Sequence, residues 1–235
     1  MFYIDWTYIV LVLPFMVLSL VASAKVNSSF KKYSEVHSKR GLSAVDAARR
    51  VLQANGVTDV AIEQVSGHLT DHFDPKDNVI RLSDSVYGST SVAAIGVACH
   101  EAGHAVQHAV GYVPVKIRTA IVPITNIGSK LSIPLIFIGI ALSYLGEFYS
   151  YIAYVGVALF SLCVIFQLVT LPTEFNASRR AIKALSENGI LDEQELKGAK
   201  KVLSAAAMTY VAALAVAVMQ LLRLLIIVGN SRRRR

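Results

Sequence analysis

The chain has 235 residues and contains little charge and little cysteine. Charged side chains make up 17% of the residues, whereas an average soluble domain has about 25%. Intrinsic disorder is excluded, because it requires few apolar residues and here 54% are hydrophobic. The two cysteines, Cys99 and Cys163, are too few for the disulfide framework of a small secreted domain. With a mean hydropathy of +0.51, the composition also excludes a typical soluble enzyme.

Charge is absent from four long stretches, which are residues 6–24, 131–146, 148–173 and 202–222. A helix needs about 20 apolar residues to cross a bilayer, with a range of ~17–25. Three of the stretches meet this requirement, and 131–146 is slightly short of it. The sequence therefore predicts about four transmembrane helices.

Basic residues outnumber acidic ones, which gives a formal net charge of +7. They flank the apolar stretches, so they favour an anionic lipid bilayer over a nucleic acid as the partner. The stretch 6–24 lacks the preceding positive charges of a signal peptide, and Lys25, Lys31 and Lys32 follow it instead. This arrangement predicts a membrane anchor that is retained.

The polar region between the first two apolar stretches predicts a small α+β domain. Ser43 and Asp46 have the spacing of a capping box at the start of a helix, and Asn55-Gly56 is a typical helix end. Alternating and β-branched residues predict strands at 57–65, 68–73 and 79–82. The Ala-rich, Pro-free segment 91–110 predicts a helix.

That last helix carries the sequence His100-Glu101-Ala102-Gly103-His104, which is an H-E-x-x-H motif. On a helix, residues i and i+4 lie on one face, so the two imidazoles can bind the same Zn²⁺. Glu101 lies beside that face and can act as general base toward a zinc-bound water. We therefore predict a zinc site with His100 and His104 as ligands and Glu101 as the catalytic residue.

A catalytic zinc usually has three protein ligands, and two residues are candidates for the third. His108 continues the i+4 series but lies ~12 Å along a straight helix from His100, too far to share one ion. Glu174 directly follows an apolar stretch, where a charge is unusual. Two apolar stretches separate His104 from Glu174, so the chain returns to the same side of the membrane. The alternative is that Glu174 begins a helix and is favoured there by the helix dipole.

Several segments together resemble a bacterial family of membrane-bound neutral zinc metallopeptidases, over nearly the whole chain. The segments are GHLTDHFDP (67–75), RLS (81–83), HEAGHAVQ (100–107), the apolar hairpin and LPTEFNASRRA (171–181). A more distant similarity connects the chain to membrane peptidases of the heat-shock and prenyl-protein-processing type. The resemblance implies that His100, His104 and Glu174 are zinc ligands and Glu101 is the base. One departure is Ser178, because the distant relatives have Asp four residues after the third ligand.

Four further residues are weaker candidates. His72 lies on a predicted strand and is a candidate for binding the substrate carbonyl or the oxyanion, or it is simply a polar residue beside a turn. Tyr210, near the start of the last apolar stretch, is a second oxyanion candidate, although tyrosine is common at membrane interfaces. His68 shares its strand face with His72. Cys99 is expected to pack in the core and not to bind metal.

Basic residues near the span ends indicate which side of the membrane holds the site. They are numerous on the side of the motif, from Lys25 to Lys201, whereas the other side has Arg223 and Arg232–Arg235. The positive-inside rule therefore predicts a cytoplasmic site in a multi-pass protein of the bacterial inner membrane. The C-terminal arginines oppose this orientation, unless the last stretch lies in the membrane interface.

We therefore predict a mostly α-helical membrane protein with a small zincin-like α+β domain, acting as a zinc-dependent endopeptidase on polypeptides. The segments are a transmembrane helix at 6–24, the zincin-like domain at 25–129, a transmembrane hairpin at 130–171, a helical segment with the third ligand at 172–201, a transmembrane helix at 202–229 and a basic tail at 230–235. One alternative is a catalytically silent zinc-binding adaptor or scaffold. Another is a hydrolase of a non-peptide amide. The sequence predicts no substrate identity and no oligomeric state.

Overall fold

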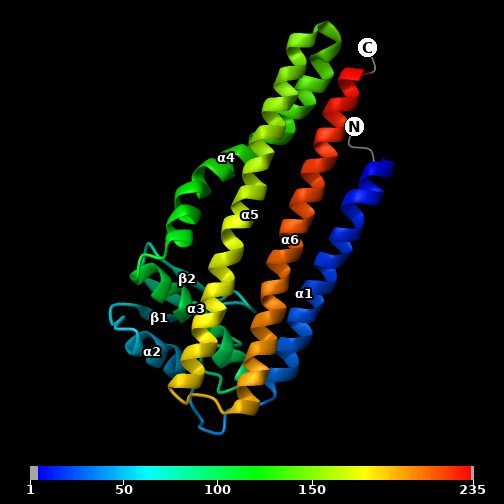
Figure 1. Cartoon of the computed structure of the whole chain (residues 1–235). Coiled ribbons are helices and arrows are strands. Elements are labelled where there is room, and N and C mark those ends of the chain that lie inside the picture. Colours follow the sequence, from blue (N-terminus) through cyan, green and yellow to red (C-terminus); the bar gives the residue numbers. More distant parts are fainter. Residues whose placement is uncertain (1–4, 234–235) are drawn as a thin grey trace. The chain divides into compact units, whose positions relative to one another are not determined.

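The computed structural model describes residues 5–233 and is mostly helical (Figure 1). A three-stranded sheet is its only sheet among these residues. The elements in chain order are η1 (Tyr8–Val12, a π-helical segment), α1 (Leu13–Ser34), α2 (Ala44–Ala54), β1 (Ala61–Val65), β2 (His72–Asp74), β3 (Val79–Ser83), α3 (Val92–Ala109), α4 (Val113–Leu142), η2 (Ser143–Leu145, a 3-10 turn), α5 (Glu147–Glu187) and α6 (Glu193–Arg233).

Four helices among the described residues are long and apolar enough to cross a membrane. They are Tyr8–Ser34, Val113–Leu145, Glu147–Glu187 and Glu193–Ser231. The predicted fold class, a mostly α-helical membrane protein with a small α+β part, is thereby confirmed. Residues 131–142 of the short apolar stretch belong to α4, which begins much earlier, at Val113, and the stretch continues into η2. Of the predicted basic tail, residues 234 and 235 lie outside the described residues.

The chain divides into two compact units, which are described separately. The hairpin unit consists of Met1–Val21, Ile117–Leu171 and Thr209–Arg235, and the sheet unit of Ala22–Lys116 and Pro172–Met208. All three strands, α2, α3, and the adjoining ends of α5 and α6 belong to the sheet unit.

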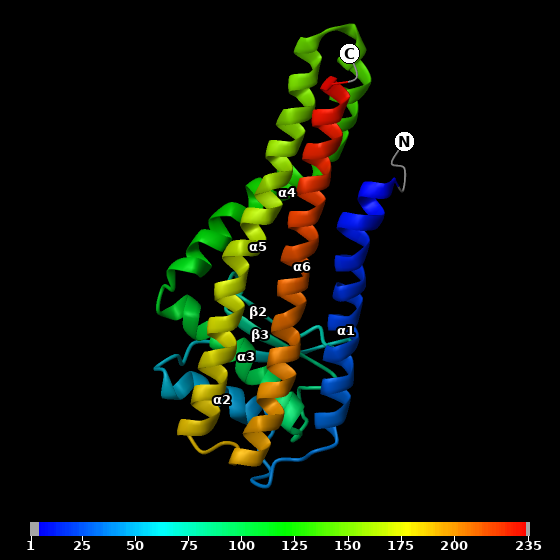
Figure 2. The same cartoon turned by 45° about the vertical axis from the view of Figure 1, so that its right-hand side comes forward.

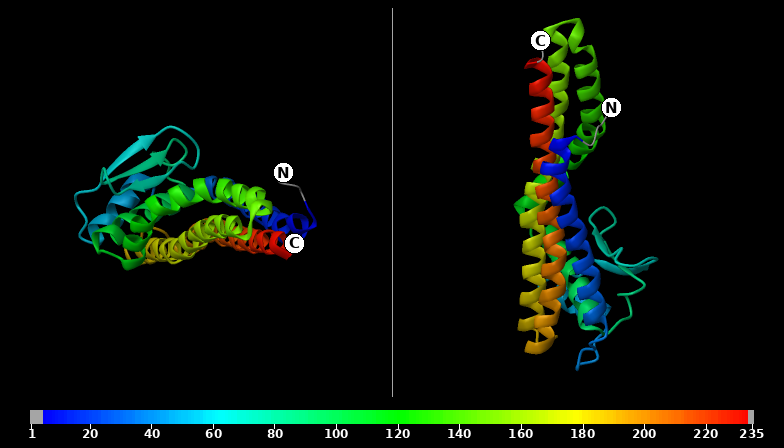
Figure 3. Two further views of the ribbon diagram at one scale, coloured as in Figure 1. Left: turned by 90° about the horizontal axis from the view of Figure 1, so that it is seen from above. Right: turned by 90° about the vertical axis from the view of Figure 1, so that its right-hand side faces the viewer.

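The sheet, whose arrows are seen from two directions in Figure 3, has the strand order β1-β3-β2. β1 pairs with β3 in parallel, and β2 pairs with β3 antiparallel, with His72 opposite Arg81. The strands before β3 are shorter than predicted. Residues 57–60 are not in β1, because the Val57 N–H closes α2 by bonding to the Leu52 carbonyl. Leu69 has φ 55°, so a turn occupies the beginning of the predicted strand 68–73.

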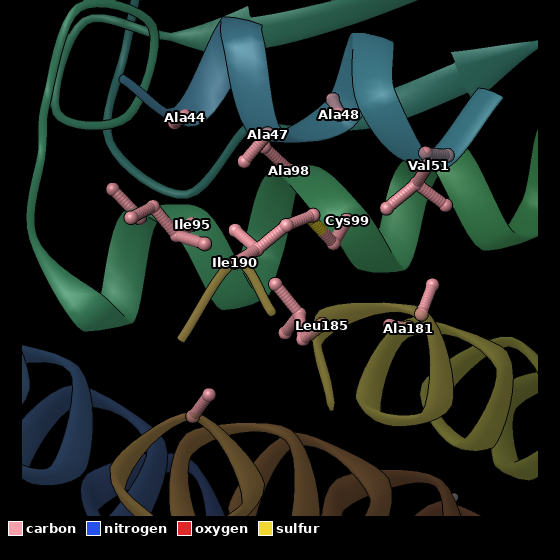
Figure 4. Packing of buried hydrophobic residues seen from close by; sticks show 14 of the residues in the cluster. Ala44, Ala47, Ala48, Val51, Ile95, Ala98, Cys99, Ala181, Leu185 and Ile190 are labelled. Atoms are coloured by element: carbon pink, nitrogen blue, oxygen red, sulfur yellow. The ribbon is translucent and has the colours of Figure 1, made fainter. Parts of the chain in front are cut away.

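The core of the sheet unit is built around α3, which lies between α2 on one side and α5 on the other (Figures 2 and 4). Small side chains dominate the contact between α2 and α3; Ala44, Ala47, Ala48 and Ala98 are fully buried. Alanine permits a close approach of two helices and is also the best helix former. This packing fixes the position of the motif helix against α2.

The start of α6 is fixed by a capping box. The Asp192 carboxylate accepts hydrogen bonds from the Gln194 and Glu195 N–H groups, and Glu195 accepts from the Asp192 N–H at 2.8 Å. The other Glu195 oxygen accepts from the Lys39 N–H at 2.7 Å. Before this helix, α5 ends at the Asn188-Gly189 turn, where the glycine has φ +56°. The turn and the cap together fix the connection from α5 to α6.

In the hairpin unit, α4 and α5 approach closely at glycines. A Cβ atom on Gly139 would collide with the backbone of Ala153, and one on Gly156 would lie 2.6 Å from the Ser132 carbonyl oxygen. Small residues of this kind let membrane helices pack backbone to backbone. Asp5 pairs with Arg223, whose side chain is only 4% exposed, at 3.4 Å.

Candidate metal centre

The motif helix α3 begins at a serine cap. The Ser91 hydroxyl accepts a hydrogen bond from the Ala94 N–H at 3.2 Å. No proline interrupts the helix, so His100 and His104 lie one turn apart on the same face. Their Nε2 atoms are 3.1 Å from each other, and their rings meet edge to face. The i, i+4 spacing thus produces a pair of converging imidazoles.

Glu174 reaches this pair from α5. Its Oε2 atom lies 3.3 Å from Nε2 of His100 and 3.4 Å from Nε2 of His104, and its side chain is 3% exposed. The three residues form a group that could hold a metal ion. α5 runs uninterrupted through Pro172, so Glu174 lies well inside a helix, and the alternative that it begins one is wrong.

The spacing of the three ligand atoms fits zinc. Tetrahedral Zn²⁺ with bonds of ~2.0–2.1 Å separates neighbouring ligand atoms by roughly 3.3–3.4 Å. The three distances in the structure are 3.1, 3.3 and 3.4 Å. Two imidazoles and one carboxylate are also a donor set found at catalytic zinc sites.

Gly103, inside the motif, allows Glu174 to come this close. A Cβ atom at this position would lie 2.7 Å from the carbonyl oxygen of Ala177 and 3.3 Å from its Cα atom. Any side chain on Gly103 would therefore push α5 away from α3. The glycine of the motif and the alanine one turn after Glu174 set the distance between the two ligand-bearing helices.

His104 is oriented by Gln107, which is completely buried. The Gln107 amide nitrogen donates to the Thr173 carbonyl at 2.8 Å and to Oδ1 of Asn176 at 2.9 Å. Its Oε1 atom then faces Nδ1 of His104 at 3.0 Å. Because an amide oxygen can only accept, Nδ1 of His104 must carry the proton. Nε2 of the neutral imidazole is then left to bind a metal.

Ser178 performs the corresponding task for His100. Its hydroxyl lies 3.1 Å from Nδ1 of His100, and a serine hydroxyl oxygen can accept a hydrogen bond from the N–H of that nitrogen. Ser178 is the position where the more distant peptidases have Asp. The ring is therefore supported here by a neutral hydroxyl in place of a carboxylate.

The pKa of His104 is raised above its ordinary value. Burial opposes the charged form, but the hydrogen bond to Glu174 and the charges of Glu101 and Glu174 outweigh that effect. The carboxylates that raise this pKa create an environment that favours a cation between the three ligand atoms. Glu101 itself is 8% exposed and lies on α3 between the two histidines in sequence.

The remaining candidates are not part of this group. His108 is exposed and its ring packs 5.9 Å from that of Phe73, while Cys99 is fully buried in the core. His68 packs against Phe30. His72 is exposed, and its Nδ1 bonds to the Thr70 carbonyl.

Tyr210 belongs to the hairpin unit, and its predicted role stays a prediction. Gln107 and Asn176 were not singled out from the sequence. Gln107 stands three residues after His104, which places it on the same helix face. This spacing is the sequence feature that points to it.

Comparison with known proteins places the chain in a family. A profile of the family described as "Putative neutral zinc metallopeptidase" matches residues 8–229. The chain belongs to this family, as its motifs predicted. A curated relative, the "Putative membrane protease YugP" of Bacillus subtilis (strain 168), is 45% identical to it over 225 residues, which are 96% of this chain and 98% of the relative. No solved structure matches the chain significantly.

Proposed function

We propose that the protein is a zinc-dependent endopeptidase of the cell membrane. The observation that carries this proposal is the triangle of His100, His104 and Glu174, with edges of 3.1–3.4 Å, beside the buried Glu101. The family and the relative named as a membrane protease support the same activity.

The proposed chemistry assigns separate tasks to the four residues. His100, His104 and Glu174 would hold a zinc ion, which when bound polarises the scissile carbonyl and acidifies water. Glu101 accepts the proton of the attacking water and passes it to the leaving amine. Gln107 and Ser178 hold the two imidazoles with Nε2 toward the metal position.

The number of ligands argues against the alternative of a silent adaptor. Structural zinc usually has four protein ligands, whereas catalytic zinc has three and one open position. The group found among residues 5–233 has three members. This difference favours hydrolysis over a purely structural role.

An edge of the sheet is a candidate for holding the substrate. β2 lies at one edge of the order β1-β3-β2, and it packs against α3 through the contact of Phe73 with His108. An extended peptide can add to such an edge through backbone hydrogen bonds. His72 is exposed on this strand and is our candidate for contacting the substrate carbonyl.

We further propose that the site faces the cytoplasm, because the basic residues near the span ends are concentrated on its side. The test uses a variant without Cys99 and Cys163, into which one cysteine is introduced. A cysteine at Ser186, in the last turn of α5, should react with an impermeant reagent only after the cells are opened. A cysteine at Tyr144, in the α4–α5 connection, should react in intact spheroplasts. The reverse pattern would contradict the orientation.

The activity is tested with detergent-purified protein, loaded with zinc and incubated with casein. Wild type should release peptides, lose this activity on chelation and regain it with Zn²⁺. Glu101→Gln should retain zinc but release no peptides, because Glu101 is assigned as a base and not as a ligand. Full activity of Glu101→Gln would contradict the mechanism, and hydrolysis of small amides but not of casein would indicate a non-peptide substrate.

A further inference from the structure

The sheet unit has a groove between α5 and α6 with a volume of about 500 Å³. α6 returns beside α5 after the short turn at Asn188-Gly189 (Figures 1 and 2). Leu203 and Ala207 of α6, both buried, form part of the groove wall. Ser178, which contacts His100, also lines the groove, so an occupant would lie close to the metal centre.

The two ends of the groove differ in polarity. Because the two helices run in opposite directions, Phe175 of α5 and Met208 of α6 lie at one end, and Lys183 and Lys200 at the other. Phe175 and Met208 are large apolar residues, and 43% and 50% of their surface, respectively, is exposed. In the sequence, Phe175 follows closely after the uncharged stretch 148–173, and Met208 lies within the uncharged stretch 202–222. The groove therefore has an apolar end and a basic end.

The basic end carries unbalanced positive charge. Arg179, Lys183 and Lys200 line the groove, and no acidic residue of the described part of the chain does. Among residues 5–233, neither Arg179 nor Lys200 has an ion-pair partner, and Lys183 pairs only with Glu187, 3.8 Å away on the exposed surface. A complementary ligand therefore has to be anionic at this end and apolar at the other.

We propose that this groove binds an anionic phospholipid. The phosphate would lie between Arg179 and Lys200, where guanidinium and ammonium groups can donate charge-assisted hydrogen bonds. An acyl chain would cover Phe175 and Met208. An acidic peptide would match the charge but would leave the apolar end without a partner. The lipid satisfies both ends.

Binding is tested on the full chain in detergent, with a fluorescent phosphatidylglycerol as the probe and the matching phosphatidylcholine as the comparison. The probe should bind saturably and more tightly than the zwitterionic lipid. Arg179→Gln together with Lys200→Gln should weaken phosphatidylglycerol binding by about tenfold or more, on the scale expected for two basic residues at a membrane surface.

The matched control is Lys197→Gln together with Lys201→Gln, which removes the same charge from exposed positions of α6 that do not line the groove. This control should bind like wild type, and all variants should retain zinc and helical content. Equal loss in both pairs would show diffuse surface attraction and overturn the proposal. Equal affinity for the two lipids, or displacement of the probe by an acidic peptide or by inorganic phosphate at similar concentration, would also overturn it.

Discussion

Gln107→Leu removes the group that orients His104 while keeping a side chain of similar size. His104 then loses the acceptor for its Nδ1 proton, and the Thr173 carbonyl loses the donor 2.8 Å away. Loss of such an outer partner of a metal ligand typically costs 10–100-fold in metal affinity. We therefore expect zinc affinity, measured by competition with a chromophoric chelator, to fall by ~10–100-fold. The zinc-free protein should also lose about 1–3 kcal/mol of stability, because the hydrogen bonds of a completely buried amide with His104, Thr173 and Asn176 are lost.

Gln107→Glu separates these two effects. Its carboxylate can still accept from Nδ1 of His104 but cannot donate to Thr173 or Asn176. Stability of the zinc-free protein should therefore fall, whereas zinc affinity should stay closer to that of wild type than in Gln107→Leu. His108→Ala, on the exposed face of the same helix turn, is the control for zinc affinity and should leave it unchanged. Wild-type zinc affinity in Gln107→Leu would refute the orientation argument.

Three further predictions concern helix spacing and protonation. Gly103→Ala places a methyl group 2.7 Å from a carbonyl oxygen of α5, so the free energy of unfolding should fall by ~1–3 kcal/mol and zinc affinity should fall as well. Gly88→Ala, which has open space around its Cβ position, is the control and should change neither quantity. Because the pKa of His104 is raised, protons should compete with zinc for this side chain already above pH ~6.5. Zinc affinity, measured by chelator competition, should therefore decrease as the pH falls, and a pH-independent affinity would contradict this prediction. Gly139→Ala should lower the thermal unfolding midpoint in detergent, whereas Gly229→Ala, with nothing near its Cβ position, should not.

The local parts of the site could be predicted from the sequence. His100 and His104 are one helical turn apart, so their convergence depends only on α3 being a helix. The prediction of Glu174 required a further argument, because its position depends on two apolar stretches that return the chain to the same side of the membrane. The structure brings these three residues together as that argument predicts.

Apart from the same-face spacing of Gln107 and His104, the supporting contacts could not be predicted from the sequence, because they depend on how α5 packs against α3. Gln107 meets Thr173 and Asn176 only when the helices are as close as Gly103 permits. Nothing in the local pattern around Ser178 indicates that its hydroxyl lies against His100. Strand ends were also misplaced, because the turn at Leu69 has a positive φ that its residue type does not indicate.

The central claim, that His100, His104 and Glu174 hold a zinc ion, is tested most directly by the zinc content of two purified variants. Glu174→Ala leaves two imidazoles without the carboxylate that lies 3.3 and 3.4 Å from them, and its zinc content should fall sharply below that of wild type. His108→Ala should contain as much zinc as wild type. Zinc retained in Glu174→Ala and lost in His108→Ala would place the third ligand on the motif helix and contradict the account.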